Sequence, residues 1–362
     1  MTSELADAAT LRRPADSAPG VRTVTVTSVI DETDDARSFV VQPDSDQAAE
    51  FVYRAGQFVT VRVPDHGRGT ARCYSLSSSP HTDGEAQLKF TVKRVAGGTG
   101  SNWICDEVAP GHILEVLPPT GVFTPSSLDE SVVLVAGGSG ITPVISIAKS
   151  ILHGGSGSVL LIYANRDEKS VIFGHELRRL SERFGSRLTV IHILESVQGY
   201  PAATQLADLI GPISTREVFV CGPTPLMDLV TSVCADLGMP RQRVRAERFL
   251  SLAGDPFNPI ADEPTPGGDE SADAAAVTVA LDGERRSVPW RRSQRLLDAL
   301  LDAGVDAPFS CREGACSACV CSLVSGEVRM VRNEVLTADD IADGYILTCQ
   351  AEPVSDDLTI EY

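Results

Sequence analysis

The sequence is poor in aromatic residues, in histidine and in long hydrophobic stretches, and each shortage excludes a class of function. Aromatic side chains make up 5% of the chain, and its 6 histidines stand apart from one another. No histidine metal site and no acid–base dyad is therefore predicted. No apolar run approaches the roughly 20 residues that cross a bilayer, and residues 1–20 lack the apolar core of a signal peptide. We expect a cytoplasmic protein without a membrane span.

Basic residues are also scarce. The chain has 31 Lys and Arg against 49 Asp and Glu, a net charge of −18, which disfavours binding to nucleic acid or to an anionic membrane. Two interpretations of this acidity stay open: it keeps the protein soluble, or it guides the protein to a basic patch on a partner. The 9 cysteines in a chain of 362 residues do not resemble a disulfide framework.

A chain of this length is expected to be multidomain, and its hydrophobic pattern divides it into three parts. After a polar tail at 1–20, short runs of alternating polarity predict an antiparallel β-barrel over 21–125. Strand and helix patterns alternate over 126–250, which predicts an α/β domain with a parallel sheet. Residues 251–276 are rich in proline, glycine and acidic residues and predict an interdomain linker. A third domain is predicted over 277–362.

The most informative motif lies in this third domain. Cys311, Cys316 and Cys319 stand in C-x4-C-x2-C spacing, and Cys349 follows far downstream. This is the ligand spacing of a plant-type [2Fe–2S] ferredoxin, in which four thiolates hold two irons. A zinc site and a set of ordinary buried thiols are the alternatives, although no second short knuckle surrounds Cys349. Cys321 belongs to an apolar, strand-like run and is interpreted as a structural thiol.

Two motifs in the first domain indicate a bound nucleotide. The tetrapeptide R-C-Y-S at 72–75 places Arg72 and Tyr74 on one face of a strand. The forked donors of arginine suit a phosphate, and a tyrosine ring suits a flat heterocycle. A glycine-rich turn at 97–102 then leads into an amphipathic helix, whose N-terminus can present free N–H groups to an anion. Taken singly, each motif also fits an ordinary strand or hairpin loop.

A second glycine-rich loop opens the α/β domain. The sequence G-S-G-I-T-P at 138–143 follows a buried strand and differs from the usual G-x-G-x-x-G fingerprint. Its glycines still allow a pyrophosphate to approach the backbone, and Pro143 suits the first position of a helix. Ser139 is not a nucleophile elbow, because Ile141 takes the place of the last glycine of that motif. The run C-G-P at 221–223 ends a later strand, at the sheet edge where ligands bind.

In this order, the motifs resemble the ferredoxin–NADP reductase family in its fused form. The resemblance covers about residues 21–362 and implies a flavin-binding β-barrel, a nicotinamide-binding α/β domain and a plant-type ferredoxin domain of α+β (β-grasp) fold. It is nearest to the reductase components of 3-ketosteroid 9α-hydroxylases, through the runs RCYSLSSSPH, GSNWICD, YANRDEKSVIFG and DAPFSCREGACSAC. It implies FAD, NADH and a [2Fe–2S] cluster as cofactors. It also implies a monomeric reductase that passes electrons to a Rieske-type terminal oxygenase in steroid metabolism and lipid degradation.

The same resemblance implies the site residues. Those expected to act at the reacting rings are Ser75, Thr142 and Cys221. Those expected to bind the flavin are Arg72, Cys73, Tyr74, Ser75, Val92, Lys93, Gly100, Ser101 and Asn102. Those expected to bind the nicotinamide cofactor are Gly138, Gly140, Thr142, Pro143, Cys221, Gly222 and Pro223. The iron ligands are expected to be Cys311, Cys316, Cys319 and Cys349.

Several alternatives stay open at this point. The chain departs from plant-type reductases because it does not end in a flavin-covering aromatic residue; Phe249 is expected near that place. The run at 165–167 leaves NADPH possible, since Arg166 suits a 2′-phosphate while the neighbouring acids oppose one. FMN is an alternative to FAD. The partner could instead be a phenylacetyl-CoA epoxidase or an aromatic-ring dioxygenase. A non-catalytic redox carrier or sensor is the alternative from a different class.

Overall fold

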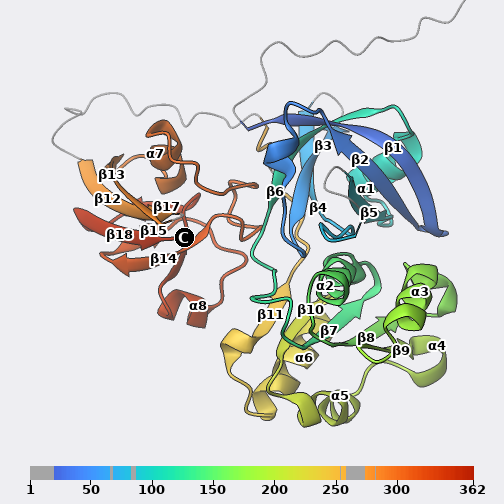
Figure 1. The fold of residues 1–362 in the computed structure, drawn as a ribbon. Coiled ribbons are helices and arrows are strands. Elements are labelled where there is room, and N and C mark those ends of the chain that lie inside the picture. Colours follow the sequence, from blue (N-terminus) through green and yellow to red (C-terminus); the bar gives the residue numbers. More distant parts are fainter. Residues whose placement is uncertain (1–19, 66–67, 83–86, 253, 258–273, 282) are drawn as a thin grey trace, which may run out of the picture.

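The computed structural model describes residues 20–65, 68–82, 87–252, 254–257, 274–281 and 283–362. Figure 1 shows three bodies: a β-rich body coloured blue to teal, an α/β body coloured green to yellow, and a mixed body coloured orange to red. Residues 1–19 of the tail predicted at 1–20, and residues 253 and 258–273 of the predicted linker, lie outside the described residues. Within the described part, no helix is both long and apolar enough to cross a bilayer.

The first body is an antiparallel sheet of six strands in the order β4-β3-β6-β1-β2-β5. An isolated bridge between Leu76 and Phe90 connects its two edges, so the sheet closes on itself. Valines and phenylalanines at alternating positions fill the interior, as the period-2 pattern predicts. The elements are β1 (Arg22–Thr33), β2 (Ala36–Pro43), β3 (Phe58–Asp65), β4 (Arg68–Ser75), β5 (Leu88–Lys93), α1 (Thr99–Glu107) and β6 (Ile113–Thr120).

The second body is a parallel sheet in the order β11-β10-β7-β8-β9. Helices α2 and α3 cover one face and α5 and α6 the other, over two separate apolar clusters (Figure 1). The chain order reverses between β7 and β10, which places a ligand crevice at the carboxyl ends of these two strands. The elements are β7 (Val132–Gly137), α2 (Ile141–Gly154), β8 (Val159–Asn165), α3 (Gly174–Phe184), β9 (Leu188–Leu194), α4 (Glu195–Gln198), α5 (Ala203–Ile210), β10 (Glu217–Cys221), α6 (Thr224–Asp236) and β11 (Val244–Glu247).

The third body is a mixed sheet in the order β13-β12-β18-β14-β16, packed on α7 around the fully buried Trp290. Its first strand begins at Ala274, so the predicted linker ends three residues earlier than expected, because Ala275 already packs in the core. The elements are β12 (Ala274–Leu281), β13 (Glu284–Arg291), α7 (Leu296–Asp302), β14 (Val320–Ser325), β15 (Val328–Met330), α8 (Ala338–Ala342), β16 (Tyr345–Leu347), β17 (Ala351–Pro353) and β18 (Asp357–Glu361). The predicted fold class, three domains with these three kinds of sheet, is confirmed.

The third body packs on both of the others. Leu252 and Phe257, from the segment predicted as linker, are buried between the barrel and the cysteine loop. On the α/β body, Arg241 bonds to Asp340 of α8 at 2.6 Å. The cysteine loop is therefore held against the barrel in this arrangement.

Candidate redox centre

The four predicted cluster cysteines lie together at one end of the third body. Cys311, Cys316 and Cys319 belong to the loop between α7 and β14, and Cys349 follows β16. The loop coils tightly because three of its residues adopt a positive φ: Arg312 at 57°, Gly314 at 73° and Ser317 at 59°. Cys311, Cys319 and Cys349 are buried, and Cys316 is partly exposed.

The surroundings of Cys311 suit a thiolate, whereas the hydrogen bonds that Cys316 and Cys349 donate raise the pKa of those two thiols. Backbone N–H groups of Glu313 and Ala315 donate to Cys311 Sγ at 3.3 and 3.4 Å. The Cys311 N–H donates to Cys316 Sγ at 3.4 Å. Hydrogen bonds from the Cys316 and Cys349 thiols lower the pKa of Cys311 to about 3. A negatively charged sulfur is therefore stabilised in this loop before any metal is considered.

The donor set fits a two-iron cluster. Among the residues that the structure describes, no group of three or more His, Cys, Asp or Glu side chains is arranged so that it could hold a single metal ion. A [2Fe–2S] cluster does not need such a group, because each of its irons takes only two protein thiolates. Cys321 lies in β14 within the apolar core, and burial raises its pKa well above the ordinary value. Its placement agrees with the structural role expected for it.

On the barrel, the R-C-Y-S strand and the glycine-rich turn come together. Helix α1 begins at Thr99, and a Cβ atom at Gly100 would lie 3.1 Å from Arg72 Cγ, so glycine at this position leaves room for the Arg72 side chain. No side chain caps α1, which leaves its first N–H groups available to an anion. The Ser101 hydroxyl and the Asn102 amide instead bind the backbone of Val95.

Tyr74 and Cys73 lie on opposite faces of β4, as strand alternation requires. The Tyr74 ring stacks on Phe90 with centroids 5.7 Å apart, and burial raises its pKa. The Cys73 thiol instead lies in an apolar cluster shared with Cys311 and Cys316 of the third body. Cys73, predicted among the flavin-binding residues, is thus placed at the contact with the cysteine loop.

The loop at 138–143 approaches the end of β10 closely. A side chain at Gly140 would lie 2.1 Å from the carbonyl oxygen of Cys221, so the two segments can meet only at a glycine. Thr142 is buried, and its hydroxyl donates to the Ser139 carbonyl at 3.1 Å. Helix α2 has no side-chain cap at its N-terminus. The Ile141 N–H already donates to the Gly138 and Ser139 carbonyls and Pro143 carries none, so a pyrophosphate would rely on the remaining N–H groups of this turn.

A pocket of about 210 Å³ opens beside this loop. It includes Lys93, Gly138 and Pro223 from the predicted set, and it adds Asn165, Glu195 and Tyr200 near the ends of β8 and β9. Both polar atoms of the buried Asn165 amide lack a hydrogen-bond partner in the described structure. The full lining is Lys93, Gly137, Gly138, Ala164, Asn165, Arg166, Ser170, Ile193, Glu195, Gly199, Tyr200, Pro201, Pro223 and Leu226.

The ends of three strands bring Ser75, Cys221 and Glu247 together. The Ser75 hydroxyl donates to Glu247 Oε2 at 3.3 Å, and Glu247 lies beside Cys221 in the parallel ladder. Burial raises the pKa of Glu247 to about 8, against the hydrogen bond from Ser75. Burial, and next the charge of Glu247, raise the pKa of Cys221. The sequence prediction missed Glu247; its signal was an acid at the carboxyl end of a short strand.

Two further expectations concern residues near the pocket. Phe249, expected near the flavin, is 49% exposed two residues beyond Glu247. The Arg166 guanidinium bonds to Asp35 of the barrel at 3.2 Å, and the Asp35 carboxylate also lies 3.6 Å from Lys93 Nζ. The positive charge of Arg166 is therefore already balanced by a carboxylate from the neighbouring domain.

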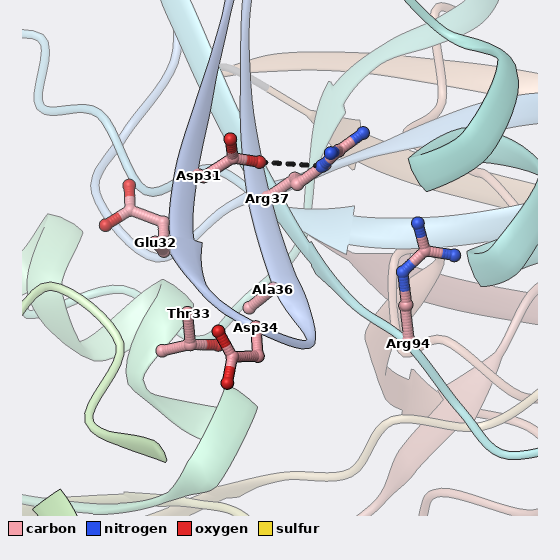
Figure 2. Close-up of a pocket in the computed structure, with 7 residues that line it drawn as sticks. All are labelled: Asp31, Glu32, Thr33, Asp34, Ala36, Arg37 and Arg94. Atoms are coloured by element: carbon pink, nitrogen blue, oxygen red, sulfur yellow. Dashed lines mark ion pairs between the residues drawn. The ribbon is translucent and has the colours of Figure 1, made fainter. Parts of the chain in front are cut away.

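A second pocket, of about 450 Å³, lies at the tip of the β1–β2 hairpin (Figure 2). Three acids and two arginines line it, and Arg37 forms an ion pair with Asp31 at 2.8 Å. Arg94 is bonded to Asp106 at 2.7 Å. Its lining contains no predicted site residue, and its arginines are already paired.

A barrel strand suited to flavin, a dinucleotide pocket and four neighbouring thiols define a class of protein. It is an oxidoreductase that combines a flavin, a nicotinamide cofactor and an iron–sulfur cluster. Three family models match the chain: an oxidoreductase FAD-binding domain at 23–124, an oxidoreductase NAD-binding domain at 134–232, and a 2Fe-2S iron-sulfur cluster binding domain at 279–354.

Similar proteins show to which family within this class the chain belongs. The 3-ketosteroid-9-alpha-monooxygenase ferredoxin reductase component of Rhodococcus rhodochrous is 54% identical over 94% of this chain and 96% of its own length. Phthalate dioxygenase reductase has a similar solved structure, with a TM-score of 0.56 and 28% identity over 95% of this chain and 98% of that one. CYP116B46 from Tepidiphilus thermophilus gives a TM-score of 0.64 and 26% identity over 97% of this chain, which spans only 44% of that protein. The chain belongs to the family of ferredoxin reductase components of 3-ketosteroid-9-alpha-monooxygenases, which are ferredoxin–NADP reductase-type flavoproteins fused to a plant-type ferredoxin.

Proposed function

We propose that this protein takes hydride from NADH and passes single electrons, through FAD and a [2Fe–2S] cluster, to the Rieske-type terminal oxygenase of a 3-ketosteroid 9α-hydroxylase. The observation that carries the proposal is the arrangement around β4. One face of this strand presents Tyr74, its end meets Cys221 and Glu247, and its other face contacts the cysteine loop. A flavin at this strand lies between a hydride donor and a one-electron acceptor.

The flavin, when bound, supplies the change from two-electron to one-electron transfer. The chain holds and orients it. Arg72 and the uncapped N-terminus of α1 would hold its phosphates, and Tyr74 would offer an aromatic ring to its heterocycle. At neutral pH the raised pKa of Glu247 keeps a proton beside the Ser75 hydroxyl. The buried, neutral Cys221 thiol excludes water from the place where the two rings meet.

The nicotinamide cofactor is held at the switch point of the parallel sheet. The glycines at 138 and 140 and the N-terminus of α2 receive its pyrophosphate. The preference for NADH is supported by charge. Glu195 lines the pocket at the carboxyl end of β9, where an acid suits a ribose 2′-hydroxyl and repels a 2′-phosphate. Asp35 also balances the charge of Arg166.

The electron acceptor is a separate oxygenase, because the relatives that match this chain along most of its length are named as the ferredoxin reductase component of a monooxygenase. The protein acts as a monomer in the cytoplasm. We expect the third domain to move between the flavin and the oxygenase. If shortening the sequence at 255–275, interpreted from its composition as a linker, left delivery of electrons to the oxygenase unchanged, this movement would be excluded.

The test is reconstitution with purified components. NADH is expected to bleach the flavin and, with a 3-ketosteroid 9α-hydroxylase oxygenase added, to support hydroxylation of the steroid. A phenylacetyl-CoA epoxidase and an aromatic-ring dioxygenase are the comparison acceptors. Turnover with only one of these comparison acceptors would identify that oxygenase as the partner. If NADH did not bleach the flavin, the protein would instead be a non-catalytic redox carrier or sensor.

A further inference from the structure

A buried hydroxyl pair joins the barrel to the cysteine loop. Thr60 Oγ1 on β3 and Ser310 Oγ lie 2.5 Å apart although the residues are 250 positions apart in the chain. Thr60 is 0% exposed and Ser310 is 1% exposed. Ser310 immediately precedes Cys311, the first of the cluster cysteines, so this hydrogen bond acts on the backbone that carries a ligand.

The same threonine also contacts the strand predicted to hold flavin. Thr60 pairs with Cys73 in the antiparallel ladder, and the Cys73 Sγ lies 3.4 Å from Thr60 Oγ1. Cys73 stands between Arg72 and Tyr74. A continuous chain of contacts therefore runs from the R-C-Y-S strand, through Thr60 and Ser310, to Cys311.

These polar groups lie in an apolar interface. The apolar cluster at this interface consists of Val21, Ala71, Leu117, Leu252, Phe257, Cys311 and Ala315, and Cys73, Leu250 and Cys316 pack against it. A buried hydroxyl without a partner is costly, and water has little access here. The two hydroxyls are satisfied together only when the third body is seated in one orientation. Figure 1 shows this body lying beside the barrel at the side of β6.

We propose that Thr60 and Ser310 are positioning residues for electron transfer, because their hydrogen bond sets the orientation of the cysteine loop on the flavin-side strand. The expected effect on electron transfer rests on the proposed function. The hydrogen bond between Thr60 and Ser310 does not depend on it. Apolar burial alone is non-directional and permits the loop to slide, whereas a hydrogen bond fixes distance and angle. The rate of electron transfer falls steeply with the distance between donor and acceptor, so a loop that slides away from the barrel slows reduction of the cluster.

Two substitutions at position 60 separate the hydroxyl from packing. Thr60→Val keeps the shape and removes the hydroxyl, and Thr60→Ser keeps the hydroxyl and removes a methyl group. If the hydrogen bond positions the loop, Thr60→Val is slow in cluster reduction and Thr60→Ser stays close to the wild type. If packing alone matters, Thr60→Ser reduces the cluster more slowly than Thr60→Val. Ser310→Ala tests the other partner, and Ser38→Ala is the matched control, because it removes one member of a buried hydroxyl pair with Thr91 elsewhere in the barrel.

Anaerobic stopped-flow with NADH measures two steps in the intact holoprotein: loss of flavin absorbance, then reduction of the cluster. We expect Thr60→Val and Ser310→Ala to leave the first step unchanged and to slow the second about fivefold, the effect of about 1 kcal/mol lost with one hydrogen bond on the population of the seated loop. Iron and sulfide analysis and the visible spectrum show whether the cluster is intact. Equal slowing of both steps, or wild-type cluster reduction in Thr60→Val, would overturn the proposal.

Amide hydrogen exchange provides a readout that needs no turnover. In Thr60→Val, exchange at 310–315 and at 71–73 is expected to accelerate, while the parallel sheet keeps its protection. Unchanged exchange at both segments would also overturn the proposal. A wild-type protein whose flavin is not reduced by NADH would refute the proposed function alone, since the exchange experiment still tests the contact.

Discussion

Glu176 gives a sharp stability prediction, because one carboxylate bridges the first two domains. Its Oε1 lies 2.9 Å from Lys149 Nζ on α2, and its Oε2 lies 3.1 Å from Lys89 Nζ on β5. The Lys149 and Lys89 side chains are only 3% and 14% exposed. Burial by itself raises the pKa of Glu176, yet the two ammonium groups hold it below its ordinary value. These three residues are called the ion triad below.

The substitution Glu176→Gln leaves both ammonium groups of the ion triad without this counter-charge. At an effective dielectric constant of about 20, each pair at roughly 3 Å contributes about 5 kcal/mol before desolvation is subtracted. Removing one partner of a buried ion pair costs about 3–5 kcal/mol overall. We expect a loss of free energy of unfolding in this range, and a fall in melting temperature of roughly 10 °C at pH 7.

The matched control is Lys89→Met, which leaves the Lys149–Glu176 pair in place. It removes one ion pair and a cation–π contact 4.9 Å from the centre of the Phe173 ring, so about 1–2 kcal/mol is expected. Thermal unfolding followed by circular dichroism compares the variants. Equal losses in Glu176→Gln and Lys89→Met would refute the reasoning.

The pH dependence gives an independent check of the ion triad. The pKa of Glu176 is lowered in the folded protein, so its contribution is present above its ordinary value of 4.5 and is lost as pH falls through the native pKa. The difference in melting temperature between wild type and Glu176→Gln should therefore narrow in acid. A difference that persists undiminished at about pH 3 would show that charge is not its cause.

Three other substitutions test the redox centre. Cys316→Ser is expected to abolish the visible absorption of the cluster and the reduction of cytochrome c while flavin reduction by NADH continues; loss of flavin reduction in a folded variant would contradict this. Burial raises the pKa of Glu247 to about 8, so flavin reduction should slow above that pH, where a negatively charged carboxylate opposes the arriving hydride. Glu247→Gln should remove this pH dependence. A pH profile unchanged by the substitution would exclude this role of Glu247. Gly140→Ala places a methyl group 2.1 Å from the Cys221 carbonyl oxygen, so flavin reduction by NADH should fall at least about tenfold. Gly211→Ala, whose methyl group would make only an ordinary contact with Leu237 at 3.5 Å, is the control and should leave this rate unchanged.

The parts of this protein that local sequence could predict are those set by short-range geometry. The spacing of Cys311, Cys316 and Cys319 already limits them to one loop, and period-2 or alternating strand–helix patterns follow from which faces of each element are buried. The same rule could have placed Cys73 on the face opposite Tyr74, yet the resemblance grouped them as flavin-binding residues. Glu247 lies at the end of β11, a strand of only four residues. So short a strand has no hydrophobic pattern from which its pairing with another strand could be predicted.

Only the tertiary structure decided which distant side chains meet. Ser75 and Glu247 are separated by 172 positions and Thr60 and Ser310 by 250, and nothing in the sequence near any of them indicates its partner. Such pairs depend on how whole domains pack, which is a sum of many weak apolar contacts together with a few buried polar groups that accept one arrangement. The sequence by itself therefore determined which cofactors the chain is built to hold. The tertiary structure decided how close their sites lie, because that distance depends on interfaces between domains rather than on any local pattern.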